Sequence, residues 1–473
     1  MLEGNRINEK LKVEKNSLLI FTIVFIGLAF IFSYGMDNVA AANVIYVNSS
    51  HGNDAWSGNS WATAKHTIKN AVGTVTNKGA IYIAPGKYNE HGIDIKKNLT
   101  ITGLNQKRTI INAQKQDRIF LIRSGSIITM KCLTLTNGTG EVQGGAIWND
   151  GVGLSVINCS FTNNFATPIS GLSSSDYGGA ICSEGTLTVI NSYFANNNVD
   201  NVIGAGEGGA IWSDNAIINS STFTNNTGAY GGAIYNNLGS IMTVTGSIFT
   251  NNHAKSYNTY WNIGHGGAIY NDGYGIPGTL TVINNIFTGN TATDYIDNIA
   301  GDYGTGGAIC NNEGTLTAHF NQFVGDTAIQ GKEIDNDGGT AIATSNWWGS
   351  NSNPTSKVYG GVSVTPWELY VTPKITSTYP KNGATKVSRT LPIYVKFNEL
   401  IKTSTNWSKI YVKDKYGHAV SISKSISGNT LYIQTSKRLS NSYYTVYIPS
   451  AAIKNYAGNN LIANYTFKFK TGP

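Results

Sequence analysis

The sequence predicts an all-β protein in which a solenoid of stacked parallel strands is followed by a β-sandwich. A Gly-Gly-Ala-Ile motif recurs through the middle of the chain, and segments between the copies alternate apolar and polar residues, as in 279–283. That alternation is typical of strands buried on one face. Residues 373–473 instead hold short alternating segments separated by Gly, Asn and Pro, which is the pattern of a sandwich.

The composition is typical of a β-rich protein displayed on a surface. The chain has 473 residues, of which 41% are hydrophobic, so it is globular rather than disordered. Its 54 glycines suit frequent turns, and its 10 prolines exclude a collagen-like chain. Charged residues make up only 13%, about half of the usual share, so Asn, Ser and Thr must solvate the surface.

Six copies of the Gly-Gly-Ala-Ile motif organise the middle of the chain, and a degenerate seventh copy follows them. The six copies begin at Gly144, Gly178, Gly208, Gly231, Gly266 and Gly306. A phenylalanine follows each copy at similar spacing: Phe161, Phe194, Phe223, Phe249, Phe287 and Phe323. The seventh copy begins at Gly331, and Trp348 takes the position of the phenylalanine.

Each repeat corresponds to one coil of the solenoid. Successive copies begin 34, 30, 23, 35 and 40 residues apart, and the shortest interval has room only for three short strands and their bends. Such coils stack about 4.8 Å apart, so we expect the Ala and Ile of each motif to face a narrow core and the phenylalanines to form a column within it. Asparagines at equivalent corners are expected to form hydrogen-bonded ladders: Asn158, Asn191 and Asn284, and Asn164, Asn197, Asn226 and Asn252.

The solenoid is predicted to span residues 43–372, with less regular strands before the first repeat. These strands are 80–83, 99–102, 109–112, 119–122 and 127–136. Ahead of them, Ile68, Ala71, Val72 and Val75 have helical spacing, and Thr63 is in position to cap the helix. A helix with one apolar side would cover the exposed first coil, as the ends of solenoids require.

Residues 1–42 have the order of a cleaved secretory signal peptide. Three lysines precede an apolar run over 18–32, and Ala40 and Ala42 follow at the A-x-A spacing of a cleavage site. The alternative is an uncleaved anchor, although this run is shorter than the ~20 residues that span a bilayer. We therefore predict an extracellular protein, secreted or associated with a cell wall, with no transmembrane anchor in the mature chain.

The repeat register argues against disulfides in this exported chain. Cys182 and Cys310 both follow Gly-Gly-Ala-Ile, in the second and sixth copies, so four coil steps of about 4.8 Å would separate them. A disulfide tolerates only ~7 Å between Cα atoms. Cys132 and Cys159 lie on neighbouring coils but one residue out of register, and therefore point to opposite faces. We expect four free thiols.

The net charge of +7 is divided unevenly along the chain. Residues 43–131 hold 12 basic and 4 acidic residues, 132–372 hold 3 and 17, and 373–473 hold 15 and 2. The last segment, at +13, is expected to bind an anionic wall polymer, unless its charge only keeps the domain soluble. No recognition helix or aromatic RNA-binding motif accompanies the charge, which argues against nucleic acid as a partner.

Several segments carry a resemblance to known surface proteins. Tyr46-Val47, Gly52-Asn53-Asp54, Trp61-Ala62-Thr63 and the IYIAPGKY of 81–88 look like the opening of a right-handed parallel β-helix of the pectin-lyase-like superfamily. The GGAIxN…FxxN repeat is similar to polymorphic outer-membrane protein repeats and to adhesin-like surface proteins of methanogenic archaea. The NWWGSNSNP of 346–354 resembles the end of the β-helix in the latter group. The resemblance covers residues 44 to about 372 and implies that fold.

The C-terminal segment, 373–473, resembles a bacterial Ig-like domain of the SbsA kind. The resemblance rests on Tyr379-Pro380, Asn382-Gly383-Ala384, the IYVKFN of 393–398, the SGNTL of 427–431 and Ala457-Gly458-Asn459. It implies an Ig-like β-sandwich after the right-handed parallel β-helix. The segment contains no cysteine, so this sandwich would lack an intersheet disulfide.

The pectin-lyase-like fold also serves enzymes, and their typical residues are missing from this sequence. Lyases of the fold use an Arg or Lys base beside calcium-bound uronate, whereas no arginine lies between Arg123 and Arg389. Hydrolases need paired carboxylates, and polygalacturonase-like enzymes show adjacent aspartates and an Arg-x-Lys motif, neither of which occurs. We predict no catalytic residues and no enzymatic activity, with a polysaccharide lyase or hydrolase as the alternative.

Carboxylates recur at one position of the repeat. On stacked coils Asp150, Glu184 and Asp214 would lie about 5–10 Å apart, which is suitable for calcium. An Asp or Glu before glycine is also an ordinary turn residue, and a catalytic role is the third alternative. Calcium is the only cofactor that the sequence suggests.

The length of the repeat varies in one place, between the phenylalanine and the next Gly-Gly-Ala-Ile. The stretches 165–177, 198–207, 253–265 and 291–305 are longer than 227–230. Insertions at one corner of a solenoid emerge on one face, which is often the binding face. Their aromatic rings and carboxylates suit a glycan or protein ligand, or else cover the loops themselves. The candidate ligand-binding residues are Asp176, Tyr177, Asp200, Glu207, Tyr257, Tyr260, Trp261, Asp294, Tyr295, Asp297, Asp302 and Tyr303.

These features predict an exported, adhesin-like surface protein. Its expected role is attachment to a glycan, a cell wall or a partner cell, through glycans or surface proteins. The alternatives are a polysaccharide lyase or hydrolase and a structural component of the wall without a specific ligand.

Overall fold

The computed structural model describes residues 43–168, 176–199, 206–255, 264–293, 304–368, 372–399, 401–455 and 458–473. Residues Val44–Pro473 form one compact unit. The predicted signal peptide, 1–42, lies outside the described residues. Within the described part of the chain, no helix has the length and apolar character needed to cross a membrane.

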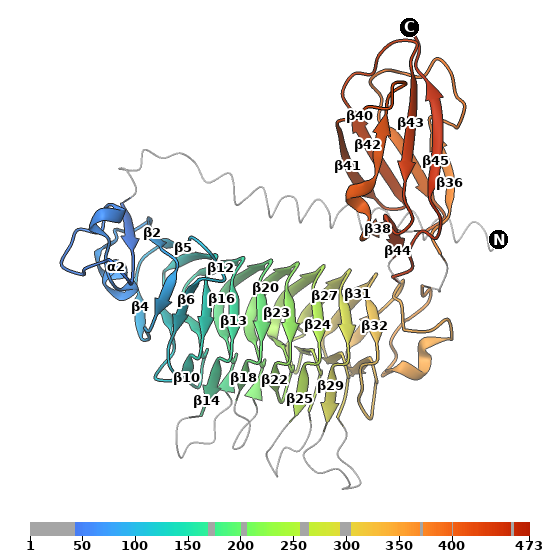
Figure 1. Cartoon of the computed structure of the whole chain (residues 1–473). Helices are drawn as coiled ribbons and strands as arrows, with labels where there is room; N and C mark the ends of the chain where they lie inside the picture. Colours follow the sequence, from blue (N-terminus) through green and yellow to red (C-terminus); the bar gives the residue numbers. More distant parts are fainter. Residues whose placement is uncertain are drawn as a thin grey trace. The chain divides into compact units, whose positions relative to one another are not determined.

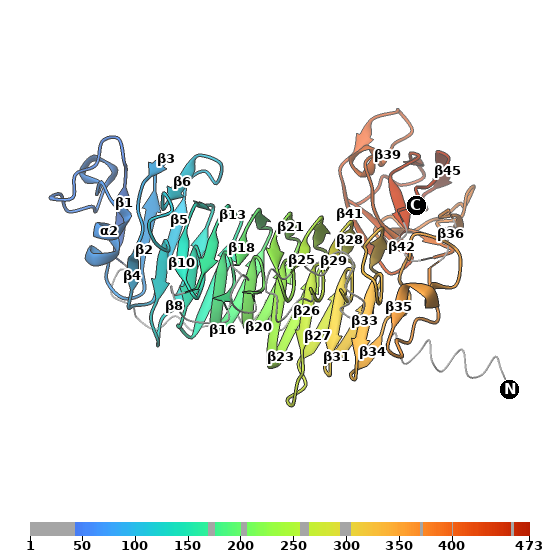
Figure 2. The same cartoon turned by 90° about the horizontal axis from the view of Figure 1, so that it is seen from below.

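The solenoid consists of parallel strands that stack in chain order, coil upon coil (Figure 1). The largest sheet contains β1 (Val44–Val47), β2 (Gly79–Ile83), β4 (Ile93–Ile95), β5 (Leu99–Gly103), β7 (Phe120–Ile122), β8 (Ile127–Lys131), β11 (Ile147–Asn149), β12 (Gly153–Ile157), β16 (Ile181–Ile190), β20 (Ile211–Asn219), β23 (Ile234–Thr245), β26 (Ile269–Asp272), β27 (Thr279–Ile283), β30 (Ile309–Asn312), β31 (Thr315–His319), β33 (Ile334–Asp337), β34 (Thr340–Ile342) and β35 (Val358–Tyr359). Its strands, among them β16, β20, β23, β27 and β31, lie side by side along the solenoid in Figure 2.

Two further parallel sheets complete the coils. The first contains β3 (Gly86–Tyr88), β6 (Thr109–Asn112), β9 (Thr134–Thr136), β13 (Ser160–Thr162), β17 (Tyr193–Ala195), β21 (Thr222–Thr224), β24 (Ile248–Thr250), β28 (Ile286–Thr288) and β32 (Gln322–Val324). The second contains β10 (Thr139–Glu141), β14 (Phe165–Thr167), β18 (Asn198–Val199), β22 (Thr227–Gly228), β25 (His253–Lys255) and β29 (Thr291–Thr293). A short pair, β15 (Asp176–Tyr177) and β19 (Gly206–Glu207), adjoins them. The fold is therefore a parallel β-helix, as predicted.

The phenylalanine column is confirmed. Adjacent rings from Phe161 to Phe323 stack with centroids 4.7–4.9 Å apart, and Trp348 continues the column 4.9 Å from Phe323. That spacing equals the step between hydrogen-bonded strands, so each ring lies directly on the next. These rings are fully buried, together with the Ala and Ile of every motif.

Both glycines of the motif are required by close backbone contacts. The first has a positive φ, for example 69° at Gly208, and a Cβ there would overlap the carbonyl oxygen of Ile211. A Cβ on the second, Gly209, would overlap the carbonyl oxygen of Gly232 in the next coil. The motif therefore makes a sharp turn and lets consecutive coils approach at that turn.

One asparagine ladder is confirmed and extends beyond its predicted members. The side-chain amide of Asn164 donates to the Oδ1 of Asn197 at 3.0 Å, and the pattern repeats through four further coils to end on Asp326. The second predicted ladder is confirmed only between Asn158 and Asn191. Asn158, Asn191 and Asn284 have φ values of 49–60°, so they are left-handed turn residues, and of these three only the first two are joined by a side-chain hydrogen bond.

The strand predictions need two corrections. The segment predicted as one strand over 127–136 is two strands, β8 and β9, because Cys132 between them has a φ of 55°. The stretches treated as variable loops each begin with a third strand of the coil, β14, β18, β25 or β29. These strands are only two or three residues long, so they leave no visible periodicity.

The N-terminal helix α2 (Ile68–Thr74) packs against the first coil through Ile68, Ala71 and Val72. Its N-cap is Thr67, whose hydroxyl accepts a hydrogen bond from the Asn70 amide at 3.2 Å. The predicted cap, Thr63, lies instead in the 3-10 helix η1 (Trp61–Thr63). The helix thus begins later than predicted, because a second Thr is available directly before Ile68.

The register of the strands confirms the predicted separation of Cys182 and Cys310. Cys182 aligns with Trp212, Tyr235, Tyr270 and finally Cys310, which is four coil steps. All four cysteines are free, and Cys132 is one residue out of register with Cys159. Cys159, Cys182 and Cys310 are buried, whereas Cys132 is partly exposed.

After β35 the strands become antiparallel and form an Ig-like sandwich with a separate core. One sheet has the order β36 (Ile375–Tyr379), β37 (Ile393–Phe397), β42 (Thr430–Thr435), β41 (Ile422–Ser427), and the other β40 (Ala419–Val420), β39 (Tyr411–Lys413), β43 (Tyr443–Ile448), β45 (Tyr465–Lys470). A small sheet pairs β38 (Ile401–Thr403) with β44 (Ile453–Asn455). Alternate residues of the two large sheets, such as Val395, Val446 and Phe467, fill the space between them.

Candidate functional site

Two columns of side chains run along the solenoid where the chain turns at each Gly-Gly-Ala-Ile motif. The residue after each motif gives Trp148, Cys182, Trp212, Tyr235, Tyr270 and Cys310, and then Asp335 in the seventh copy. The residue before each motif gives Gln143, Tyr177, Glu207, Tyr230, His265, Thr305 and Gln330. We call the two columns together the aromatic–carboxylate strip.

The turn at the motif is what brings the columns together. Because Gly208 has a positive φ, the chain folds back and the residue before the motif, Glu207, lies over the residue after it, Trp212. Since every coil repeats this turn, the strip continues from coil to coil. Residues after the motif point away from the main core and form a second, smaller apolar cluster of Cys182, Trp212, Tyr235, Tyr270 and Cys310.

The aromatic rings of the strip contact one another across the columns. Tyr177 lies 5.3 Å from Trp212, and Tyr230 lies 5.1 Å from Tyr270, measured between ring centroids. Tyr235 stacks on Tyr270 at 5.3 Å within its own column. These offset and tilted arrangements are favourable for aromatic pairs, so the rings hold each other in place.

Carboxylates along the strip accept hydrogen bonds from the polar edges of these rings. The indole Nε1 of Trp148 donates to Oε1 of Glu184 at 3.0 Å, and that of Trp212 donates to Oε2 of Glu207 at 3.0 Å. The hydroxyl of Tyr235 donates to Oδ2 of Asp272 at 2.5 Å. Each carboxylate is thus oriented by a ring and keeps further acceptor capacity.

Burial shifts the protonation of the strip toward neutral side chains. It raises the pKa values of Tyr230, Tyr235 and Tyr270, with a further contribution from nearby carboxylates. Burial also lowers the pKa of His265 to about 4, so this imidazole is neutral at pH 7. The neutral ring accepts from or donates to the hydroxyl of Thr305, 2.8 Å away. The strip therefore combines neutral rings with carboxylates.

Three of the predicted ligand-binding residues lie in the described part of the chain. Tyr177 and Glu207 belong to the strip, and both contact Trp212. Asp176 precedes Tyr177 but is buried, with 1% of its surface exposed. Outside the described residues lie Asp200, Tyr257, Tyr260, Trp261, Asp294, Tyr295, Asp297, Asp302 and Tyr303.

Sequence reasoning missed the column that follows the motif. Four of the six complete copies are followed by an aromatic residue: Trp148, Trp212, Tyr235 and Tyr270. Polar residues usually occupy the solvent side of a strand, so repeated aromatic residues at an outward-facing position indicate a second row of packed side chains.

The three carboxylates predicted to bind calcium align at one corner of the solenoid. Asp150, Glu184 and Asp214 follow aligned residues, and the preceding coil places Arg123 in the same column. They have different partners, since Glu184 accepts from Trp148 and Asp214 accepts from Asn237 at 2.8 Å. Among the described residues, no group of three or more His, Cys, Asp or Glu side chains is placed to hold a metal ion.

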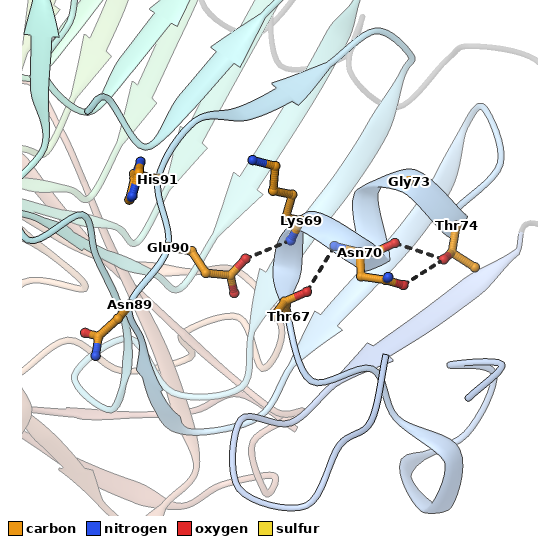
Figure 3. Close-up of a pocket in the computed structure, with 8 residues that line it drawn as sticks. All are labelled: Thr67, Lys69, Asn70, Gly73, Thr74, Asn89, Glu90 and His91. Atoms are coloured by element: carbon orange, nitrogen blue, oxygen red, sulfur yellow. Dashed lines mark hydrogen bonds between the residues drawn. The ribbon is translucent and has the colours of Figure 1, made fainter. Parts of the chain in front are cut away.

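A surface depression of about 640 Å³ lies beside helix α2 (Figure 3). Glu90 is its central side chain, and its carboxylate accepts hydrogen bonds from the amides of Ile68 and Lys69, both at 2.8 Å. Burial raises the pKa of Glu90, while these two hydrogen bonds lower it. The carboxylate therefore caps the first turn of the helix.

Two protein-family models match parts of the chain. The Chlamydia polymorphic membrane protein repeat matches residues 158–184, 220–237 and 246–272, and the bacterial Ig-like domain matches residues 371–471. The chain thus combines repeats of the polymorphic membrane protein type, which form the stacked parallel sheets, with a C-terminal bacterial Ig-like domain. Both are found in families of surface proteins, and the combination is typical of autotransporter and adhesin-like proteins.

No curated protein matches the chain. Among solved structures, a rhamnogalacturonan lyase aligns with 64% of this chain and 74% of its own at 13% identity, with a TM-score of 0.22. A similarity this distant carries no argument about activity.

Proposed function

We propose that this protein is an exported, extracellular adhesin of the kind found in methanogenic archaea, built on a pectin-lyase-like right-handed β-helix and an SbsA-type Ig-like domain. The surface-protein repeats and the Ig-like domain support this role. The hydrophobic N-terminal segment, over 18–32, supports export. The protein has no catalytic function in this proposal, and it attaches the cell to a glycan, a wall or a partner cell.

The aromatic–carboxylate strip is the observation that carries the proposal. Its half-buried rings, Trp148, Tyr177 and Tyr230, offer apolar surface to sugar faces or protein side chains, and its carboxylates accept hydrogen bonds from hydroxyl groups. Glu184, which accepts a hydrogen bond from Trp148 beside the strip, is exposed. In the sequence, the variable stretches of the repeats directly precede the column that contains Tyr177.

The C-terminal domain supplies attachment to the wall in this proposal. Residues 373–473 hold 15 basic and 2 acidic residues, which favours an anionic wall polymer through long-range attraction. Calcium is the one cofactor worth testing, since it would bridge the acidic solenoid to acidic sugars.

A glycan array with the purified protein, run with and without calcium, tests the adhesive role. We expect binding to a limited set of glycans and a loss of at least tenfold in Trp148→Ala. Tyr193→Ala serves as the matched control, because this ring is 41% exposed on a different sheet. Release of unsaturated or reducing uronides from a polysaccharide panel would instead support the lyase or hydrolase alternative. Absence of binding across glycans and isolated surface proteins would leave a structural wall component.

A further inference from the structure

We propose that the outer face of the sheet β40-β39-β43-β45 binds an acidic polysaccharide through alternating lysines and tyrosines. The face consists of Tyr411, Lys413, Tyr443, Tyr447, Lys468 and Lys470, and we call it the Tyr–Lys face. The inference rests on the proposed attachment to a wall and deepens it, since it assigns that attachment to one face and one polymer class.

The strand register places these six side chains on one surface. Tyr443 pairs with Lys470, Lys413 pairs with Thr445 and through it with Lys468, and Tyr411 pairs with Tyr447. The alternating residues Val412, Val446 and Phe467 point the other way, into the core. Because side chains alternate across a strand, all six members of the face point to solvent.

Lysine and tyrosine contact each other within the face. The ammonium of Lys413 lies 4.9 Å from the ring centroid of Tyr411, and that of Lys470 lies 5.5 Å from the centroid of Tyr443. Tyr411 and Tyr447 stack at 4.8 Å. Cation–π contacts of this kind hold the long lysine side chains near the rings, so their charges are positioned before a ligand arrives.

No carboxylate in the described part of the chain neutralises these charges. None of the three lysines forms an ion pair with any described residue. The nearest acidic residue in sequence, Asp414, accepts hydrogen bonds from the amides of Tyr416 and His418, both at 2.9 Å, within its own turn. Tyr443 is 55% exposed. The face therefore combines unpaired positive charge with accessible aromatic surface.

An acidic polysaccharide matches both parts of this surface. Its carboxylates pair with lysine ammonium groups, and the apolar sides of its sugar rings pack on tyrosine. A protein partner that offered only charged side chains would not contact the tyrosine rings. Single-stranded nucleic acid also combines anions with rings, and the acidic solenoid of a second copy also carries carboxylates. These two occupants are outcomes of the test.

The experiment measures binding of the full chain to polygalacturonate at low and high salt, with a neutral polysaccharide and single-stranded DNA as further ligands. The triple variant K413Q/K468Q/K470Q removes the charge of the face. The matched control, K374Q/K381Q/K437Q, removes three exposed lysines from other parts of the same domain. Y443S removes an exposed ring without changing charge.

We expect the face variant to weaken binding to polygalacturonate by at least about tenfold, and the control by less than twofold. Y443S should weaken binding several-fold even at high salt, where electrostatic attraction is screened. Equal losses in the two triple variants, or tighter binding to DNA than to polygalacturonate, would overturn the inference. So would self-association that the face variant abolishes while polygalacturonate remains unbound. None of these results bears on the glycan array, whose readout depends on Trp148.

Discussion

Asp326 occupies the position that asparagine holds in the preceding coils of the ladder. Its Oδ1 accepts from the backbone and side-chain amides of Asn290, both at 2.7 Å, and its carboxyl group interacts with that of Glu333. Both side chains are almost fully buried, and Nζ of Lys357 lies 3.1 Å from Oε1 of Glu333. Burial and mutual repulsion raise the pKa of Asp326, so the pair shares a proton in the folded state.

The carboxyl pair predicts that stability falls as the pH rises. The folded pKa of Asp326 is raised, so the folded state holds a proton that the unfolded chain releases above pH ~4. The free energy of unfolding should therefore decrease from pH ~4 up through the raised folded pKa. Asp326→Asn should flatten this dependence and stabilise the protein at pH 8 by about 1–3 kcal/mol, since an amide can donate to Glu333.

Urea unfolding between pH 4 and 8 measures this effect. Asp337→Asn is the control, because Asp337 is an exposed carboxylate of the coil that contains Glu333. If Asp326→Asn destabilises the protein at pH 8 as much as at pH 4, the shared proton is wrong.

The buried cysteines predict a chain with four free thiols. Cys182 and Cys310 are separated by four coils, and burial raises both thiol pKa values well above normal. Mass spectrometry without reduction should find no disulfide. A thiol reagent should label Cys132 first and the other three only after unfolding, because the thiolate is the reactive form. A linkage between Cys182 and Cys310 would contradict the alignment of the coils.

At the scale of the repeat, the second glycine of each motif is restricted by the backbone of the neighbouring coil. Gly209→Ala should destabilise the protein by about 3 kcal/mol or more, because the new methyl group meets backbone atoms of Gly232 and Thr227, which cannot rotate away. Gly73→Ala, in helix α2, has open space around its Cβ and should stabilise by up to about 1 kcal/mol. Thermal unfolding of the two variants measures the difference, and equal effects would show that coils can separate at the motif.

The coil could be predicted from sequence, whereas the candidate site was predicted only in part. The motif and the phenylalanine recur at near-constant spacing, so the spacing alone predicts the column from Phe161 to Trp348. The third strand of each coil was not predictable, because segments such as Thr227–Gly228 are too short to show a period. Trp212 and Tyr270 join the strip through a turn whose geometry depends on a positive φ, which residue types alone do not reveal.

At the scale of the whole molecule, the described residues of the solenoid and of the sandwich each form a main hydrophobic core, and these two cores share no residue. One runs along the solenoid and includes Phe223, and the other fills the sandwich and includes Val446. Separate cores predict two unfolding transitions in calorimetry. Phe223→Ala should lower only the solenoid transition, at a cost of about 3–5 kcal/mol, and Val446→Ala only the sandwich transition. A single transition that both variants shift equally would show that the two parts unfold as one.

The repeats keep their register although their lengths range from 23 to 40 residues. Most of the extra residues enter at one corner, between the phenylalanine and the next motif, and lengthening a loop costs only about 0.6 kcal/mol for each doubling. A gene for this protein can therefore gain or lose codons at that corner without moving a single ring in the phenylalanine column. The coils can therefore be inherited unchanged while the surface loops diversify. Descendants of this chain can acquire new loops on the same scaffold.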